Sequence, residues 1–334
     1  MIINRYPWLI KPYKNIIHQH QVGKAHHALL INTYPGIGVL NLCWSITRWL
    51  LCKKKQGIRS CGQCHGCYLM TSNNHPDWYY LKTKNNTDLL GVEIIRNTID
   101  KIFYTAQQNG EKVIWFPNTK YITYAGICSL LKTLEEPPKN TWFFLINYNS
   151  FKLSSTLRSR CLSYYLSPPS EEKGIYWLKK NNCYQNELLS LTALRITEGA
   201  PILAKKIIKG TLWSERQLFF LNLENAINKK DLFNLLPFFT KNKMHVIIYI
   251  DWICYLLFDS IKWKYSLFAY IKNLDQEKFI IYLSLNYSIT FLDKSIQSWI
   301  ICKHQLMHVI GVNYELLLTE QLLRWEKNLP HHKK

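Results

Sequence analysis

The stretch Thr33-Tyr34-Pro35-Gly36-Ile37-Gly38-Val39-Leu40 directly follows the apolar run 28–31, and this junction decides the fold. A phosphate-binding loop reads G-x-x-x-x-G-K-[ST]: its backbone N–H groups hold phosphates, its lysine contacts the outer phosphates and its hydroxyl binds Mg²⁺. Here two glycines keep the turn, but Val39 replaces the lysine and Leu40 replaces the hydroxyl residue. Because neither side chain can do this chemistry, we predict a nucleotide-binding fold that hydrolyses no nucleotide.

The first half of the chain alternates strand-like and helical patterns. Strand-like runs occur at 28–31, 78–82, 112–116, 141–146 and 162–166. Helical patterns lie between them, including 92–105 and 124–136. Strands that alternate with helices predict a parallel sheet covered by helices. The fold class we expect is therefore an α/β domain like that of P-loop nucleotidases, followed by helical domains.

A double proline interrupts the alternation at Ser167-Pro168-Pro169-Ser170, and the sequence beyond it is helical in period. Such a segment is typical of a domain hinge. We therefore expect three domains: an α/β domain over 1–167, a small helical domain over 168–210, and an all-helical C-terminal domain over 211–334. A cysteine-rich module at about 52–67 would be inserted in the first domain.

That module carries four cysteines with metal-ligand spacing. Cys61, Cys64 and Cys67 follow one another at intervals of three, and Cys52 lies nine residues upstream. Four thiolates complete a tetrahedral zinc site and leave no open position for water, so a structural zinc is expected. His65 could be the fourth ligand instead, and Cys52 would then bind no metal. The other alternative is that the cysteines are close in sequence by chance. The remaining cysteines lack this spacing and are expected to be buried core residues: Cys43, Cys128, Cys161, Cys183, Cys254 and Cys302.

The chain is strongly basic, with 42 Lys and Arg against 22 Asp and Glu, a net charge of +20 over 334 residues. A positive surface favours nucleic acid as a partner. However, frequent Lys, Asn, Ile and Tyr are also expected from an AT-rich genome, and the lysines are spread along the chain. The charge alone therefore leaves direct DNA contact open.

Membrane and secretory signals are missing from the sequence. The first residues lack the apolar region and cleavage site of a signal peptide. The longest apolar stretch, 246–258, is interrupted by Asp251 and is expected to be a buried helix. We therefore expect a cytoplasmic protein without a membrane partner, in which cysteines are reduced or metal-bound.

A second catalytic motif is also absent. An ATPase places an Asp for Mg²⁺ and a Glu that activates water directly after the strand expected at 112–116. Those positions hold Pro117 and Asn118, which can do neither. Since two independent elements are missing together, no intrinsic ATP hydrolysis is expected.

Three further segments follow in order. The helix 130–136 ends at Pro137-Pro138, the strand 141–146 comes next, and Thr156-Leu157-Arg158-Ser159-Arg160-Cys161 follows. This ordered set resembles the clamp-loader branch of the AAA+ proteins, with its LLKxLEEPP helix and its Ser-Arg-Cys motif. The resemblance covers nearly the whole chain and is densest up to about residue 166.

The resemblance implies a pseudo-ATPase AAA+ domain, a lid domain and a C-terminal collar that joins a ring of subunits. It implies a non-hydrolysing subunit of the bacterial DNA polymerase III clamp loader, with the δ and the ATP-hydrolysing τ/γ subunits as partners. The complex would open the β sliding clamp and place it on primed DNA during replication. As part of that polymerase, the chain would be classed with the DNA-directed DNA polymerases, which are nucleotidyltransferases.

The resemblance also implies a role for Arg160. In the family, the arginine of Ser-Arg-Cys reaches the ATP site of the neighbouring subunit as a finger, and a guanidinium suits this role because its planar fork pairs with phosphate oxygens. The alternative is a structural arginine that pairs with a local carboxylate. Arg158 is expected to be structural, on the opposite side of an extended segment. Glu135 and Glu136 are expected to be packing or interface residues without a catalytic role.

A different class of function competes with this one. A zinc-dependent nucleic-acid-binding protein acting outside a clamp loader would use the basic surface and the cysteine module to contact phosphates directly. It would bind DNA tightly as an isolated chain, with a steep dependence on salt. A clamp-loader subunit alone is expected to bind DNA weakly.

Overall fold

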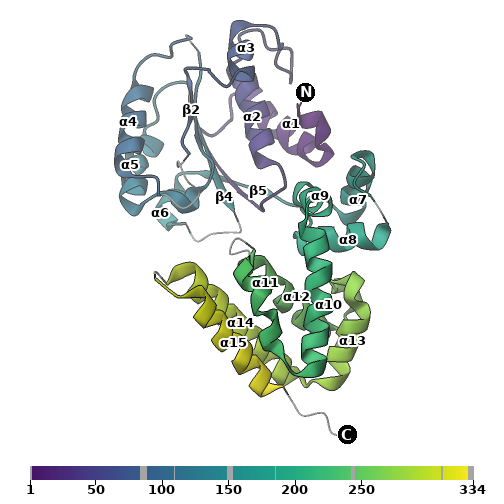
Figure 1. Cartoon of the computed structure of the whole chain (residues 1–334). Helices are drawn as coiled ribbons and strands as arrows, with labels where there is room; N and C mark the ends of the chain where they lie inside the picture. The colour runs from purple at the N-terminus through teal and green to yellow at the C-terminus, as the bar shows by residue number, and fades with distance from the viewer. Residues whose placement is uncertain are drawn as a thin grey trace. The chain divides into compact units, whose positions relative to one another are not determined.

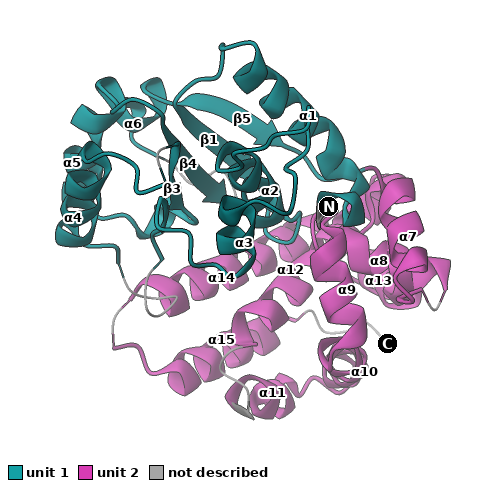
Figure 2. Ribbon diagram, turned by 90° about the horizontal axis from the view of Figure 1, so that it is seen from above, with its two compact units in different colours: residues 1–169 teal, residues 170–334 magenta. Residues whose placement is uncertain are grey.

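A computed structural model describes residues 2–82, 89–108, 110–148, 153–184, 186–241, 245–309 and 311–329. The chain divides into two compact units, Met1–Pro169 and Ser170–Lys334 (Figure 2). Their boundary falls inside the double-proline segment 167–170, where the sequence analysis places a hinge. The further division at residue 210 stays a prediction.

Unit 1 is built around a parallel sheet of five strands in the order β2-β3-β4-β1-β5 (Figure 1). Its strands are β1 (Ala28–Thr33), β2 (Trp78–Tyr80), β3 (Lys112–Phe116), β4 (Thr141–Tyr148) and β5 (Leu162–Leu166). Every residue of β3 is buried, as expected for a parallel strand that is covered on both faces. The predicted fold class is confirmed.

Helices cover both faces of this sheet. They are α1 (Pro7–Gln21), α2 (Val39–Leu50), α3 (His65–Thr71), α4 (Val92–Phe103), α5 (Tyr124–Glu135) and α6 (Ser155–Ser159), with the 3₁₀ turns η1 (Ile2–Arg5) and η2 (Thr119–Tyr121). Figures 1 and 2 show α4 and α5 on one side of the sheet and α1 and α2 on the other. Apolar residues of α4 and α5, such as Ile95 and Leu130, share one buried cluster with strand residues such as Ile114 and Phe143. On the other face, the Trp115 indole donates to the Thr47 hydroxyl of α2.

The described part of unit 2 is helical throughout. Its helices are α7 (Glu171–Lys180), α8 (Glu187–Ile196), α9 (Pro201–Lys209), α10 (Leu212–Lys229), α11 (Leu236–Lys241), α12 (Val246–Lys264), α13 (Glu277–Asn286), α14 (Ile289–His308) and α15 (Tyr314–Asn328), with the 3₁₀ turns η3 (Leu232–Leu235), η4 (Phe268–Tyr270) and η5 (Leu274–Gln276). Aromatic rings pack in the core of this bundle; Phe219, for example, stacks on Tyr249 with centroids 5.1 Å apart. Within the described ranges of the chain, no helix combines the length and the apolar character that crossing a membrane requires.

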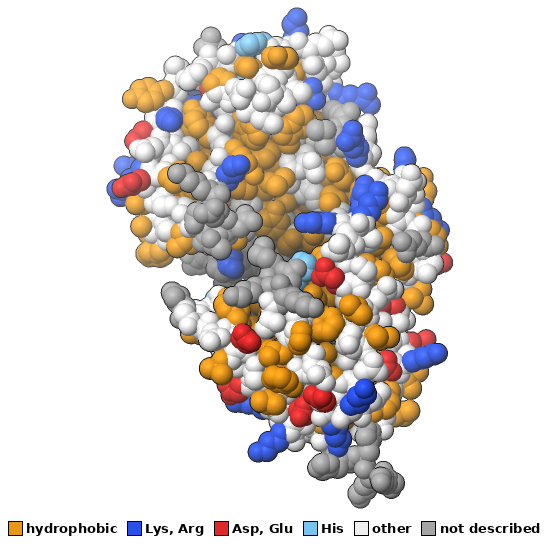
Figure 3. Space-filling view, viewed as in Figure 1, with side chains coloured by type: hydrophobic (Ala, Val, Ile, Leu, Met, Phe, Trp, Pro, Cys, Tyr) orange, Lys and Arg blue, Asp and Glu red, His pale blue; other side chains and the backbone are white. Residues whose placement is uncertain are grey.

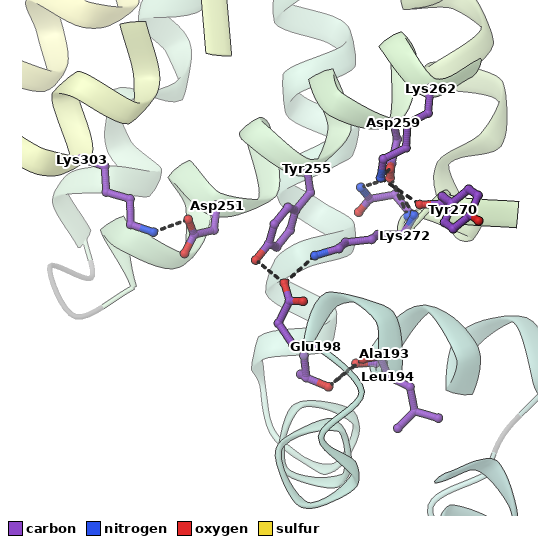
Figure 4. Close-up of polar contacts among 12 residues, drawn as sticks. Ala193, Leu194, Glu198, Asp251, Tyr255, Asp259, Lys262, Tyr270, Lys272 and Lys303 are labelled. Atoms are coloured by element: carbon purple, nitrogen blue, oxygen red, sulfur yellow. Dashed lines mark hydrogen bonds and ion pairs between the residues drawn. The ribbon is translucent and has the colours of Figure 1, made fainter. Parts of the chain in front are cut away.

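Charged contacts inside unit 2 connect α7–α9 to the bundle (Figure 4). Glu198, just after α8, pairs with Lys272 and accepts a hydrogen bond from the Tyr255 hydroxyl of α12. Arg195 pairs with Glu171 at 2.8 Å and donates to the Ile271 carbonyl at 2.6 Å. The helices expected to form the lid are thus joined to those expected to form the collar.

A fully buried arginine lies in the same region. The Arg216 guanidinium of α10 pairs with Asp275 and donates to the Asn273 side-chain oxygen at 2.6 Å. Asn273 in turn donates to the buried Asp259 at 2.8 Å from both its backbone and its side-chain nitrogen. Because a buried charge is tolerated only when it is paired, this network ties α10 and α12 to residues 273–275.

Replacing Arg216 with Met is therefore expected to destabilise the protein by about 3–5 kcal/mol, because Asp275 would keep its charge without its partner. Urea unfolding of the full chain, followed by circular dichroism, measures the loss. Arg324, which forms an exposed pair with Glu320, is the control. Its replacement by Met is expected to change stability by less than about 0.5 kcal/mol. Equal losses of unfolding free energy in the two variants would show that the buried ion pair contributes no more to stability than the exposed one.

Candidate functional site

The loop between β1 and α2 keeps the turn of a phosphate-binding loop without its charge. Gly36 and Gly38 adopt the left-handed backbone with φ of 82° and 93°, which favours glycine, and Gly38 is the N-cap of α2. The Trp8 indole of α1 donates to the Ile37 carbonyl at 2.8 Å. Val39, at the lysine position, is buried in the first turn of α2.

Neutral amides stand at the carboxyl ends of the neighbouring strands. After β3, Pro117 precedes Asn118, whose side chain accepts from the Lys120 backbone at 3.0 Å and caps η2. In β4, the buried Asn147 donates to the Asn32 side chain of β1 at 2.8 Å. Asn118 thus caps the turn after β3 and Asn147 joins β4 to β1, and neither side chain is a carboxylate.

The structure brings the four predicted cysteines together in one cluster. The thiol sulfurs of Cys52, Cys61, Cys64 and Cys67 all lie within 4.8 Å of one another. The sulfurs of Cys52 and Cys61 are 3.5 Å apart, those of Cys52 and Cys64 are 3.8 Å apart, and those of Cys61 and Cys67 are 4.0 Å apart. Four sulfurs around one zinc ion would be separated by about 3.8 Å, because Zn–S bonds are about 2.3 Å long. The cluster could therefore hold a metal ion of this kind.

Backbone N–H groups support thiolates in part of this cluster. Those of Gln63 and Cys64 lower the pKa of the Cys61 thiol. Burial acts to raise the pKa of Cys64, but hydrogen bonds from the backbone of Cys67 and Lys53 bring it to about 6. Burial raises the pKa of Cys52 to about 12 and also raises that of Cys67. A bound cation would favour the thiolate of both.

The cysteine module is anchored to the helices beside it. The Tyr13 hydroxyl of α1 donates to the Ile58 carbonyl at 2.7 Å, and the Trp49 indole of α2 donates to the Gly57 carbonyl at 2.9 Å. Gly66 has no room for a side chain, since a Cβ there would lie 2.5 Å from the Leu51 carbonyl oxygen. These contacts hold the segment that carries three of the cysteines against the end of α2.

His65 and the cysteines outside the cluster lie elsewhere on the surface or in the core. His65 begins α3 with an exposed side chain, and the ligand cluster found among the described residues contains only the four cysteines. The prediction that Cys128 is a core residue is wrong, because Cys128 is exposed on α5. Its helix is amphipathic, and Leu130 and Leu134 supply the buried face instead. The other five unclustered cysteines are buried as predicted.

Arg160 caps the C-terminal end of α6 and pairs with Glu135 at the end of α5. It also donates to the Thr156 carbonyl at 2.8 Å, and its side chain is 29% exposed. The pairing with a local carboxylate is the alternative that the sequence analysis kept open. The structure thus fixes where the guanidinium rests in the isolated chain.

The segment before Arg160 is not extended. Ser155–Ser159 forms the helix α6, capped by the Ser154 hydroxyl, so Arg158 does not face the opposite side of an extended strand as expected. A helix this short carries little periodic signal in the sequence. The Arg158 side chain is exposed.

Both halves of the chain match models of polymerase subunits. Residues 9–170 match the family described as DNA polymerase III, delta subunit, and residues 211–327 match the family described as DNA polymerase III, delta subunit, C terminal. The second match begins at residue 211, where the sequence analysis starts the C-terminal domain.

Relatives with similar sequences extend over nearly the full length. The DNA polymerase III subunit delta' of Buchnera aphidicola from Acyrthosiphon pisum is 50% identical over 325 residues, covering 97% of this chain and 98% of that protein. The subunit delta' of Escherichia coli K12 is 36% identical over 324 residues, covering 97% and 96%. The DNA polymerase III subunit gamma of Buchnera aphidicola from Schizaphis graminum is 30% identical over 182 residues, covering 52% and 49%. The chain therefore belongs to the delta' subunit family of DNA polymerase III, and the clamp-loader resemblance of its sequence is confirmed.

Proposed function

We propose that this chain is a non-hydrolysing subunit of the DNA polymerase III clamp loader, which helps to load the β sliding clamp onto primed DNA in the cytoplasm. The observation that carries the proposal is a phosphate-binding turn with Val39 at the lysine position and Leu40 at the hydroxyl position, in a chain that matches a delta' subunit over 97% of its length. Its partners would be the δ subunit and the ATP-hydrolysing τ/γ subunits. The degenerate loop between β1 and α2 would have a structural role and no catalytic one.

The proposed contribution to catalysis is Arg160, acting on the ATP site of a neighbouring subunit. Arg160 comes just before β5, whose residue Leu162 pairs with Leu29 near the start of β1. The degenerate loop follows the other end of β1. Because β1 has 6 residues, the two ends of the sheet are about 20 Å apart. The guanidinium is therefore placed away from the loop of its own chain, which favours a role toward another subunit.

Glu135 would pair with the Arg160 guanidinium until a phosphate of the neighbouring subunit replaces it. The ion pair is partly exposed, with 29% of the Arg160 side chain and 48% of the Glu135 side chain accessible. Exposed pairs contribute little free energy, so Arg160 could exchange its carboxylate for a phosphate at modest cost.

The proposed cofactor is one zinc ion, held by Cys52, Cys61, Cys64 and Cys67. The spacing of their sulfurs and the lowered pKa of Cys61 and Cys64 support it. Four thiolates leave no position for substrate, so the ion would stabilise the module rather than catalyse a reaction.

Metal analysis of the purified protein is expected to find about one equivalent of zinc, and Cys64→Ser is expected to lower that content and the melting temperature, because one ligand is lost. Cys128→Ser, which removes an exposed cysteine outside the cluster, is the control and should keep the metal. A fully folded wild-type protein without metal would contradict the zinc proposal.

The isolated chain is expected to hydrolyse no ATP above background, because the positions of the lysine, the hydroxyl and both acids hold other residues. Restoring two of them with Val39→Lys and Leu40→Thr should still give no turnover, since Pro117 and Asn118 supply no carboxylate. Phosphate release at saturating ATP is the measurement. Turnover that survives further purification and changes on mutation of Gly38 would show that the loop is catalytic.

Arg160→Ala is expected to leave the fold and ring assembly intact but to slow clamp- and DNA-stimulated ATP hydrolysis by the adjacent subunit. Arginine fingers contribute roughly 10³–10⁵ to the rate at the site they serve. The other sites of the ring would keep their own rates, so loading should be impaired rather than abolished. Steady-state ATPase assays of reconstituted complexes measure the effect.

Arg158→Ala removes an exposed arginine from α6, the helix that Arg160 caps, and is the matched control, expected to retain the wild-type rate. Arg160→Lys should rescue poorly, because an ammonium lacks the planar fork. Glu135→Gln should keep the activity, since it frees the guanidinium without removing it. Equal rates for wild type and Arg160→Ala, with assembly confirmed by gel filtration, would make Arg160 a structural arginine.

A further inference from the structure

Residues 1–76 contain no Asp or Glu side chain. The first Asp or Glu in the sequence is Asp77. The same stretch holds Arg5, Lys11, Lys14, Lys24, Arg48, Lys53, Lys54, Lys55 and Arg59. All 22 acidic residues therefore lie at or after position 77.

The fold gathers much of this positive charge on one surface. Hydrogen bonds from Tyr13 to Ile58 and from Trp49 to Gly57 hold the segment 53–59 beside α1 and α2. Lys55 lies over the Trp49 ring, 4.5 Å from its centroid. The basic segment 53–59 is thereby held beside the helix that carries Lys11 and Lys14.

Six exposed basic side chains make up what we call the basic face: Lys11, Lys14, Lys53, Lys54, Lys55 and Arg59. Lys11 and Lys14 are three residues apart on α1 and therefore share one side of that helix. Figure 3 shows mostly hydrophobic and uncharged side chains over α2 and α3, with blue side chains around the edge of this region and red side chains of unit 1 near α4.

No ion pair among the described residues involves a side chain of the basic face. Asp77 and Glu111, which line a cavity together with Lys53 and Lys55, are engaged in the fold. Asp77 accepts the backbone N–H groups of residues 107 and 108 at 2.7 and 2.9 Å, and Glu111 accepts from the Trp142 indole at 2.8 Å. These two carboxylates keep their charge and offset part of that of Lys53 and Lys55, whereas Lys11, Lys14, Lys54 and Arg59 do not line this cavity. The positive charge of those four side chains is thus available to a partner.

We infer that the basic face binds the phosphate backbone of duplex DNA, outside the degenerate loop and Arg160. Lys and Arg side chains that neutralise phosphates release counterions, and this release drives binding without regard to sequence. A protein partner fits less well, because none of the large hydrophobic side chains of segments 7–20 and 52–61 is exposed, and protein interfaces need an apolar centre. The cysteine module would then hold four of the six basic residues against the duplex.

The test compares two variants of the full chain that carry the same change in net charge. The basic-face variant combines Lys11→Gln, Lys14→Gln, Lys54→Gln and Arg59→Gln. The control variant combines Lys206→Gln, Lys229→Gln, Lys278→Gln and Lys327→Gln, which are exposed positions of unit 2. Fluorescence anisotropy with a short labelled DNA duplex, repeated at several NaCl concentrations, gives the affinity and its salt dependence. Melting temperature and zinc content show that each variant is folded.

The wild-type chain is expected to bind weakly and with a steep salt dependence. The basic-face variant should bind at least about tenfold more weakly at low salt, and its slope of log K against log salt should be smaller by about 3–4, since each lost phosphate contact removes about 0.9. The control variant should keep the wild-type slope. Equal losses in the two variants would mean that net charge alone attracts DNA, and would overturn the inference. An unchanged slope in the basic-face variant would overturn it as well.

Discussion

The pairing of β1 with both β4 and β5 is the constraint on which unit 1 depends. It places Leu29 beside Phe144 on one side and beside Leu162 on the other, so β1 is an interior strand. At its carboxyl end the chain must turn through Gly36 and Gly38 into α2. At the opposite end of the sheet, β4 and β5 begin just after the segments that carry Glu135 and Arg160. The degenerate phosphate-binding loop and Arg160 thus lie at opposite ends of β1. Arg160 is the residue proposed to act on the ATP site of a neighbouring subunit.

Much of this arrangement could be predicted from the sequence because its signals are local. Buried parallel strands are short apolar runs bounded by turns, and the five strands lie where such runs predict them. The four cysteines were found by their spacing, which reflects how a backbone turns around one ion. The empty positions Val39 and Leu40 were visible because a phosphate-binding loop is a contiguous motif.

What the sequence did not reveal depends on contacts between distant residues. The pair between Arg160 and Glu135 joins side chains 25 residues apart, and only the packing of α5 against α6 brings them together. The exposure of Cys128 depends on which side of α5 faces the sheet. The basic face arises because the segment 53–59 folds back along α1, and the contacts of Glu198 and Arg216 in unit 2 require the whole helical bundle.

Arg160 is proposed to stabilise charge that develops in the ATP site of a neighbouring subunit. Single-turnover phosphate release by complexes containing Arg160→Ala tests this most directly, with ATP affinity measured in parallel. The account predicts a slower hydrolysis step at the affected site with nearly unchanged ATP affinity, because a finger acts on the transition state more than on bound nucleotide. Hydrolysis as fast as in the wild-type complex, or weaker ATP binding that explains the whole loss, would contradict it.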